Sequence, residues 1–370
     1  MNGRLPTGVD RVCLAYIRRY GSYARALIHW GGHGWSLSPN ASQALFNLLQ
    51  EPPREIRRTV IRIIATSPPQ LLPDNCPSAT FLFNIGHSGL ERPGYAAWIA
   101  RKNLRPLFMV HDLIPITHPE YCRPGESVKH SARMDAVLKA AAAIVTNSRA
   151  TLDELTAYAG TNGLPLPPSV AALLAPPPTL NPDDTPPMKG PYFVIVSTIE
   201  PRKNHWMLLQ VWRRLVEQHG TDRAPRLVVI GQRGWECENV VDLLERSKEL
   251  QGVVTELPTC TDRELATWLR HARALLFPSF CEGFGLPLVE AMALGTPAIA
   301  GNLPVFREIA GDIPEYLDPL DGLGWQAAIE EYTLPDSQAR AAQLERLEQY
   351  APPTWKRHFA SVDQLLEEIA

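Results

Sequence analysis

The sequence predicts an α/β fold divided into two domains, each with a mostly parallel β-sheet flanked by helices. The chain has 370 residues, which exceeds the ~100 to 200 residues of one typical hydrophobic core. Short apolar runs alternate with segments of helical length in both halves, the pattern of parallel α/β sheets. A proline-rich stretch from Gly163 to Pro191 separates the halves and is typical of a stiff connection. We therefore expect domains at residues 1–175 and 186–354.

Composition is that of a globular protein with an uneven charge. Apolar residues make up 45% of the chain, and the formal net charge is −3. Residues 1–185 hold 18 Lys/Arg against 13 Asp/Glu, whereas residues 186–370 hold 18 against 26. This asymmetry raises the hypothesis that the first half meets something anionic, such as a membrane surface or a phosphate-bearing acceptor.

Cysteine usage and hydropathy indicate a cytoplasmic protein. The six cysteines form no CxxC pair and have no metal-like spacing, which favours reduced thiols and no metal site. No apolar run approaches the ~18 residues that span a bilayer, and the N-terminus has no apolar signal-peptide core. We therefore expect any membrane contact to be peripheral.

The first twenty residues predict a loop followed by a helix. The loop contains Gly, Pro and Thr, and either Thr7 or Asp10 is a suitable helix cap. A candidate strand follows from Tyr23 to Trp30, and then the glycine-rich segment GGHGW at 31–35. Because this segment does not match GxGxxG, a turn is favoured over a nucleotide-binding loop.

Residues 51–65 predict a basic amphipathic helix. Its four arginines are Arg54, Arg57, Arg58 and Arg62. Its apolar side is formed by Ile56, Val60, Ile61 and Ile64. An ordinary surface helix is the favoured interpretation, and a helix that lies on anionic lipid headgroups is the alternative.

The sheet of the first domain leads to two candidate site residues. Apolar strands are expected at 80–85, 107–110 and 142–148, with a helix at 129–142 before the last strand. The second strand runs directly into His111 and Asp112. Open α/β sheets build their binding sites at the carboxyl ends of strands, so His111 is a candidate for substrate contact. A histidine that stabilises a turn or the core is the alternative.

The second domain repeats the α/β rhythm. Strands are expected at 192–200, 226–231 and 253–258, and helices at 206–220, 241–250 and 262–272. Arg202 and Lys203 lie just past the first of these strands. Gly231 to Trp235 and the loop that carries Glu282 are expected at the same sheet edge.

Residues 275–301 form a strongly punctuated strand-loop-helix-strand unit. The helix begins near Pro287 and ends at Gly295, residues that suit a first turn and a left-handed position past a helix end. Gly283 and Gly285 leave backbone N–H groups in front of the helix, a candidate site for a phosphate or diphosphate. Arg202 and Lys203 would bind such a diphosphate and neutralise it as a leaving group.

Two carboxylates frame this candidate anion site. Glu282 and Glu290 would repel a phosphate, so we expect them to accept hydrogen bonds from hydroxyl groups. Glu282 would meet a transferred sugar and Glu290 a ribose. The alternative is a plain α/β unit with solvated glutamates.

These residues together resemble a known enzyme family. Glu282 to Glu290 matches the E-x7-E element of retaining glycosyltransferases, and PSFCEGFGLPLVEAMALGTPAIA at 278–300 resembles glycosyltransferase family 4. EPRKNH at 200–205 resembles the diphosphate-binding segment of that family. VHDLIPITHPEY at 110–121 is similar to a segment of members that act in bacterial cell-surface polysaccharide synthesis. NLPVFREIAGD at 302–312 and TGVDRV at 7–12 resemble further loops of the family.

The resemblance implies a GT-B fold, with two Rossmann-like domains facing a central cleft and a final helix, 355–370, that returns to the first domain. It implies a nucleotide-sugar donor in the second domain and a saccharide or lipid-linked saccharide acceptor in the first. The resemblance favours mannose as the sugar and leaves glucose, galactose and rhamnose donors open. It further implies that transfer proceeds with retention and that no metal or other cofactor is required. The implied catalytic residues are His111, Arg202, Lys203 and Glu282. The implied donor-binding residues are Gly231, Gly283, Phe284, Gly285, Leu286 and Glu290, and the implied acceptor-side residues are Gly8 and Asp112.

One departure from the family pattern concerns the first strand. Family members have a β-strand before the glycine loop, whereas this sequence starts inside that loop. We therefore expect either an upstream start or an N-terminal sheet without its first strand. In the second case, a catalytically impaired sugar-nucleotide-binding or scaffold protein is the alternative function.

Two other function classes lack support in the sequence. An NAD-dependent or epimerising enzyme would need a G-x-G-x-x-G strand-helix junction with an acidic residue further on, and the sequence has none. Nucleic-acid binding is not indicated, because basic residues are not interleaved with aromatic ones.

Overall fold

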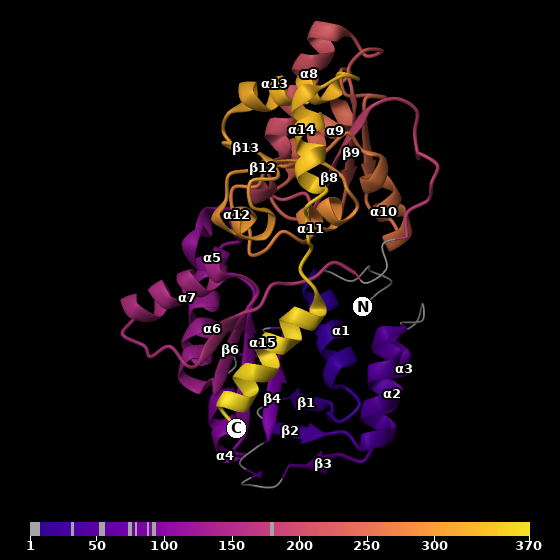
Figure 1. Ribbon diagram of the computed structural model, residues 1–370. Coiled ribbons are helices and arrows are strands. Elements are labelled where there is room, and N and C mark those ends of the chain that lie inside the picture. Colours follow the sequence, from indigo (N-terminus) through magenta and orange to yellow (C-terminus); the bar gives the residue numbers. More distant parts are fainter. Residues whose placement is uncertain are drawn as a thin grey trace. The chain divides into compact units, whose positions relative to one another are not determined.

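A computed structural model describes residues 8–30, 33–51, 56–72, 76–77, 80–86, 89–90, 94–177 and 181–370. The chain divides into two compact units (Figure 1). The first comprises residues 1–116, 125–172 and 355–370, and the second comprises residues 117–124 and 173–354. Thr7, Gly31, Gly32 and Arg54, which the sequence analysis named, lie outside the described residues.

The first unit contains a small antiparallel sheet. Its strands, in the order β1-β2-β3, are β1 (Leu27–Trp30), β2 (His33–Ser36) and β3 (Gln70–Leu71). The helices of this region are α1 (Gly8–Tyr20), α2 (Pro39–Gln50) and α3 (Ile56–Thr66). The candidate strand at 23–30 is present over Leu27–Trp30, as one arm of an antiparallel β1–β2 hairpin in which Leu27 pairs with Ser36.

The packing of α3 only partly follows the predicted apolar side. Ile56 is buried, and Val60 and Ile63 pack on a core formed by α2 and the hairpin. Ile61 was expected on the apolar side but is 56% exposed.

The first unit also contains a parallel sheet of four strands, in the order β4-β5-β6-β7. The strands are β4 (Phe81–Asn84), β5 (Arg105–Val110), β6 (Ala143–Thr146) and β7 (Ser169–Ala171). The accompanying helices are α4 (Tyr95–Arg101), α5 (Ile114–Thr117), α6 (Glu126–Ala140) and α7 (Arg149–Thr161). Ser148 caps α7, because its Oγ accepts a hydrogen bond from the Thr151 N–H at 3.0 Å.

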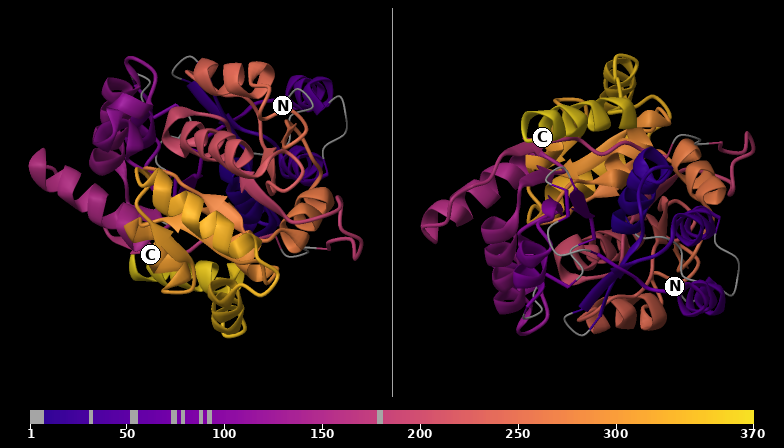
Figure 2. Two further views of the ribbon diagram at one scale, coloured as in Figure 1. Left: turned by 90° about the horizontal axis from the view of Figure 1, so that it is seen from above. Right: turned by 90° about the horizontal axis from the view of Figure 1, so that it is seen from below.

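Strand β7 corrects the predicted start of the linker. It falls inside the proline-rich stretch, yet Ser169 pairs with Ile144 of β6 in parallel register. The C-terminal helix α15 (Trp355–Glu368) packs against β6 and β7 (Figures 1 and 2). His358 anchors it, since Nδ1–H donates to the Ala172 carbonyl at 3.1 Å and Nε2 accepts from the Tyr16 hydroxyl at 3.0 Å.

The second unit is built on a parallel sheet of six strands, in the order β10-β9-β8-β11-β12-β13. The strands are β8 (Tyr192–Val196), β9 (Arg226–Ile230), β10 (Val254–Leu257), β11 (Leu275–Phe277), β12 (Ala298–Gly301) and β13 (Glu315–Leu317). The helices are α8 (His205–His219), α9 (Glu238–Arg246), α10 (Asp262–His271), α11 (Leu286–Ala293), α12 (Pro304–Ala310), α13 (Gly322–Thr333) and α14 (Gln338–Leu347). Short 3-10 turns occur at Pro119–Tyr121 and Pro201–Lys203.

The strand order of the second unit reverses between β8 and β11. From β8 the chain adds β9 and β10 on one side, and it then crosses to β11 and adds β12 and β13 on the other. Helix α8 contacts α9 and α13, and helix α11 contacts α10 and α12 (Figures 1 and 2). Ligands of open parallel sheets bind where the strand order reverses, outside the carboxyl ends of the strands. In this unit that point lies between the loops that follow β8 and β11.

Candidate active site

The loops after β8 and β11 meet because their strands are parallel neighbours. Leu275 of β11 pairs with Val194 of β8, so both loops leave the same sheet edge. The Phe280 N–H donates to the Arg202 carbonyl at 2.9 Å and joins the two loops directly. Asn204 ties them further, because its Nδ2 donates to the carbonyl oxygens of Pro278 at 3.4 Å and Pro319 at 2.8 Å.

Four charged side chains form a cluster at this junction: Glu200, Arg202, Lys203 and Glu282. We call them the charge cluster. Arg202 donates from Nη1 to Oε2 of Glu282 at 2.9 Å and pairs through Nη2 with Oε1 of Glu200 at 2.7 Å. Lys203 Nζ donates to Oε1 of Glu282 at 2.5 Å. The side chains are 4% to 19% exposed, so the cluster is largely withdrawn from water.

Glu282 is the centre of this cluster. Besides the two cations, the Ser279 hydroxyl donates to its Oε1 at 2.7 Å. Burial by itself would raise the pKa of Glu282, but the Lys203 ammonium and the Arg202 guanidinium outweigh burial and lower the pKa to about 2. Burial lowers the pKa of Lys203, and the Glu282 carboxylate opposes that change.

This arrangement differs from the role expected for Glu282. A carboxylate offers about four lone-pair positions, and three hydrogen bonds to Glu282 are already made within the chain. About one position is left for a sugar hydroxyl. In this structure the main contact of Glu282 is therefore with the two cations that were expected to bind the diphosphate.

The glycine-containing loop before α11 has the predicted punctuation. Gly285 caps the helix with a φ of 109°, and a Cβ atom there would lie 2.7 Å from the ring of Phe306. Gly295 has a φ of 74° just past the helix end. Phe284 and Glu290 are each 4% exposed, while Gly283 and Leu286 are partly exposed.

Gly231 brings the loop after β9 close to the end of β8. A Cβ atom at Gly231 would lie 1.9 Å from the Ser197 carbonyl oxygen, so this position tolerates no side chain. The following Gly234 N–H donates to the Ile199 carbonyl at 2.9 Å. The loop from Gly231 to Trp235 therefore packs directly beside the stretch that ends in Glu200.

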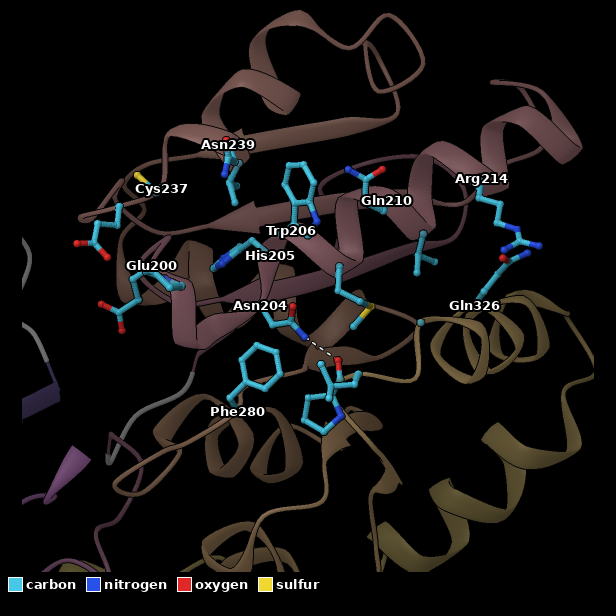
Figure 3. Close-up of a pocket in the computed structure, with 18 of the residues that line it drawn as sticks. Glu200, Asn204, His205, Trp206, Gln210, Arg214, Cys237, Asn239, Phe280 and Gln326 are labelled. Atoms are coloured by element: carbon cyan, nitrogen blue, oxygen red, sulfur yellow. Dashed lines mark hydrogen bonds between the residues drawn. The ribbon is translucent and has the colours of Figure 1, made fainter. Parts of the chain in front are cut away.

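A cavity of about 740 Å³ opens on the α8 side of the charge cluster (Figure 3). Of the four cluster residues, Glu200 lines it, and Trp206, Gln210 and Arg214 follow one another along α8 in its wall. Figure 3 also shows Asn204 bonded across to the loop that carries Pro319.

The first-unit candidates lie at the carboxyl end of β5. His111 is 7% exposed, its Nε2–H donates to the Ile85 carbonyl at 2.7 Å, and burial lowers its pKa. The Asn147 amide donates to the His111 carbonyl at 2.8 Å. Asp112 stabilises the following turn, because its Oδ1 accepts from the Ile114 N–H at 3.2 Å. Gly8 is the exposed first residue of α1.

Sequence reasoning missed three residues that the structure brings to the site. Glu200 stands in the EPRKNH segment, and a carboxylate next to two cations was a usable signal of an ion pair. Ser279 lies three positions before Glu282 in a loop. A spacing of three residues has no fixed geometry in a loop, so it gave no signal of the hydrogen bond between the two side chains. Tyr121 stacks on Phe280 with ring centroids 5.3 Å apart and planes at 7°, although the two residues are far apart in sequence.

The residues that the structure describes show neither a candidate metal site nor a candidate membrane span. Within them, no three His, Cys, Asp or Glu side chains gather in a way that could hold a metal ion. Likewise, no helix in that part of the chain combines the length and apolar character needed to cross a bilayer. The six cysteines form no disulfide within the described part of the chain.

Curated relatives of this chain include mannosyltransferases, two of which are named as O-antigen chain enzymes. O-antigen chain mannosyltransferase B of Escherichia coli is 34% identical over 165 residues, which cover 45% of this chain and 42% of the relative. O-antigen chain mannosyltransferase RfbU of Salmonella typhimurium is 35% identical over 159 residues, 41% of each protein. Serotype-specific mannosyltransferase WbdA of Escherichia coli is 28% identical over 219 residues, 55% of this chain and 26% of the relative. The chain thus matches less than half of the length of each of these relatives.

Solved structures match over more of the chain and confirm the two-domain GT-B fold. Anabaena HepE, solved in complex with UDP, has a TM-score of 0.66 at 14% identity and covers 99% of this chain and 97% of its own. Sucrose-phosphate synthase from Thermosynechococcus elongatus has a TM-score of 0.56 at 18% identity. The match covers 74% of this chain and 70% of the synthase chain. Residues 179–313 match the family described as glycosyl transferases group 1. This chain therefore carries a glycosyl transferases group 1 domain on a GT-B fold, as its resemblance to glycosyltransferases predicted.

Proposed function

We propose that the protein is a retaining glycosyltransferase of family 4. It transfers a sugar, mannose in the first instance, from a nucleotide diphosphate sugar to a saccharide or lipid-linked saccharide during surface polysaccharide synthesis. The observation that carries this proposal is the charge cluster: two cations lie at the strand-order reversal of the second sheet, beside the glycine-containing loop before α11. The names of the relatives favour mannose.

In the proposed reaction, the bond between the anomeric carbon and the diphosphate oxygen breaks, and the electron pair stays with the diphosphate. The acceptor hydroxyl oxygen then bonds to the anomeric carbon on the same face, and the hydroxyl proton leaves with the diphosphate. Arg202 and Lys203 stabilise the charge that develops on the leaving group. Residues of the α11 loop and Glu290 hold the rest of the donor, and Gly231 lets the neighbouring loop approach. No metal ion is required for this charge stabilisation.

The first unit supplies the acceptor side in this proposal. His111 faces the transferred sugar in this proposal. Its lowered pKa keeps the imidazole neutral near pH 7, and because Nε2–H donates to the Ile85 carbonyl, the other ring nitrogen is an acceptor. Gly8 and Asp112 belong to the same acceptor side.

A screen of sugar nucleotides tests the proposal. A donor at about 100 times its dissociation constant stabilises the folded state by about 2.7 kcal/mol, which a thermal-shift measurement detects. We expect GDP-mannose to give the largest shift among GDP-mannose, UDP-glucose, UDP-galactose and dTDP-rhamnose. We then expect release of the nucleotide diphosphate when a lipid-linked saccharide is added. A donor that binds without any turnover would favour the scaffold alternative, and the absence of any shift would contradict the donor site.

We further propose a peripheral contact between the basic first half of the chain and anionic lipid. Arg57, Arg62 and the 56% exposed Ile61 present cations and one apolar side chain on α3. At low salt, the protein should co-sediment with vesicles of phosphatidylglycerol and phosphatidylcholine. The variant with Arg57→Glu and Arg62→Glu should stay in the supernatant. Equal retention of both proteins would assign α3 to an ordinary surface helix.

A further inference from the structure

The charge cluster is balanced without any ligand. It holds two cations and two carboxylates, with Arg202 placed between Glu200 at 2.7 Å and Glu282 at 2.9 Å. The Glu200 and Glu282 side chains are 4% and 7% exposed. Such a cluster needs no counter-ion from solvent.

A diphosphate would upset this balance. Each phosphate of a sugar nucleotide bears one ester link and one anhydride link and therefore carries one negative charge. Two added negative charges at a balanced and dehydrated cluster are costly unless a carboxylate gains a proton or moves away.

We propose that Glu200 is a positioning residue that fixes the Arg202 guanidinium, and that it takes up a proton when a nucleotide diphosphate sugar binds. This inference rests on the proposed function of the site. Because Glu200 is ion-paired with Arg202 at 2.7 Å, it acts on the site through the orientation of the guanidinium.

The contacts single out Glu200 rather than Glu282 as the proton acceptor. Glu282 is held by the donors of Arg202, Lys203 and Ser279, and protonation would disrupt all three contacts. Among the described residues, Glu200 is ion-paired with Arg202 alone. Burial raises the pKa of Glu200, and the nearby Glu282 carboxylate adds to this rise while Arg202 and Lys203 oppose it.

The other titratable groups around Glu200 do not fit this role. The glycine-containing loop after β9 packs on the Glu200 Cβ, and its Arg233 is paired with Glu256 and Glu245. Glu236 lines the same cavity but is exposed. His205 adjoins Lys203, and burial together with that cation lowers its pKa to about 3, far below neutral pH.

Calorimetry with an intact sugar nucleotide measures the proton directly. GDP-mannose and UDP-glucose have no phosphate that titrates between pH 6 and 8, so heats in phosphate and in Tris buffer at pH 7 report protons taken up by the protein. We expect a net uptake that approaches one proton per donor bound. Proton uptake also makes the affinity depend on pH. The dissociation constant of the donor should fall by up to tenfold for each unit by which the pH is lowered, which is the limit for one linked proton.

Glu200→Gln keeps an oxygen that accepts from Arg202 but cannot take up the proton. We expect this variant to bind the donor with no proton uptake and with an affinity that is flat from pH 6 to 8. Glu236→Gln, which alters an exposed carboxylate of the same cavity, should keep the wild-type proton count. Glu200→Asp should restore part of the pH dependence.

The number of protons that the wild-type protein takes up on donor binding tests the inference even if Glu200→Gln fails to fold. Donor binding without proton uptake by the wild-type protein overturns the inference and leaves the proposed function standing. Uptake that persists in folded Glu200→Gln also overturns it. Absence of binding by every sugar nucleotide overturns the proposed function and the inference with it.

Discussion

The ammonium group of Lys203 lies 2.5 Å from Oε1 of Glu282, although 79 positions separate the two residues in the chain. The cation follows β8 and the carboxylate follows β11. Because these strands are adjacent and parallel, their loops leave the same edge of the sheet. The sheet topology itself therefore brings the two side chains close together.

Replacement of Lys203 by Ala should lower turnover of the donor by ~100-fold or more, because the variant loses one of two cations that stabilise the departing diphosphate. Initial rates of nucleotide release measure the effect. Lys189→Ala removes an exposed cation of the same unit and should be neutral. A loss smaller than tenfold in folded Lys203→Ala would remove Lys203 from the leaving-group role.

The lowered pKa of Glu282 makes part of the stability depend on pH. A carboxyl whose pKa is about 2 when folded and ~4.3 when unfolded stabilises the fold above pH ~4.3 and loses that contribution as the pH falls towards 2. At pH 6, the free energy of unfolding measured in urea should therefore be higher for the wild-type protein than for Glu282→Gln. This gap should narrow by about 2 kcal/mol at pH 3. Glu345→Gln changes an exposed glutamate and should show no such convergence.

Gly285→Ala should destabilise the second unit by two additive effects. The φ of 109° is unfavourable for any residue with a Cβ, and the new methyl would lie 2.7 Å from the Phe306 ring. Gly295→Ala is the matched control, since its φ of 74° is also left-handed but the nearest atom, Nη1 of Arg270, is 3.8 Å away. We expect a loss of unfolding free energy about 1 to 3 kcal/mol larger at Gly285 than at Gly295. Equal losses would show that Phe306 moves aside freely.

Tyr121→Ala should loosen the loop that carries Phe280. The stacked rings lie 5.3 Å apart, and such pairs contribute about 0.5 to 1.5 kcal/mol beyond their buried area. Hydrogen exchange of residues 278–285 should accelerate in Tyr121→Ala and stay unchanged in Tyr121→Phe, which keeps the ring. Acceleration in both variants would assign the effect to the hydroxyl instead.

Residues 192–301 of the second unit could be predicted almost element by element from the sequence, because their strands are short buried apolar runs with clear helix starts and stops. Helices α12, α13 and α14 and strand β13 were not predicted, and residues 302–312, expected as a loop, contain α12. Pro287 and Gly295 mark α11 as expected. The first unit was harder. Its hairpin strand β1 looks like any apolar run, and only pairing with β2 makes it antiparallel. Likewise, β7 lies in a proline-rich stretch that does not look like a strand, and its pairing with β6 is what makes it one.

The charges of the site were visible in the sequence, but their partners were not. Arg202, Lys203 and Glu282 were predicted to lie at one sheet edge, which the structure shows. A one-dimensional pattern gives no distances, so it placed the cations and Glu282 on different parts of a donor. The ion pairs form because the side chains reach across two loops. Hydrogen bonds from the Phe280 N–H to Arg202 and from the Asn204 side chain to Pro278 hold these loops together.

Neither compact unit is a continuous stretch of chain. The chain passes between the units after Ile116, Pro124, Ala172 and Thr354. A single proteolytic cut therefore frees neither unit whole, and a chimaera joined at one point would leave α15 beside a foreign sheet. Exchange of donor specificity between enzymes of this architecture would need four junctions, so that residues 117–124 travel with the second unit and residues 355–370 stay with the first.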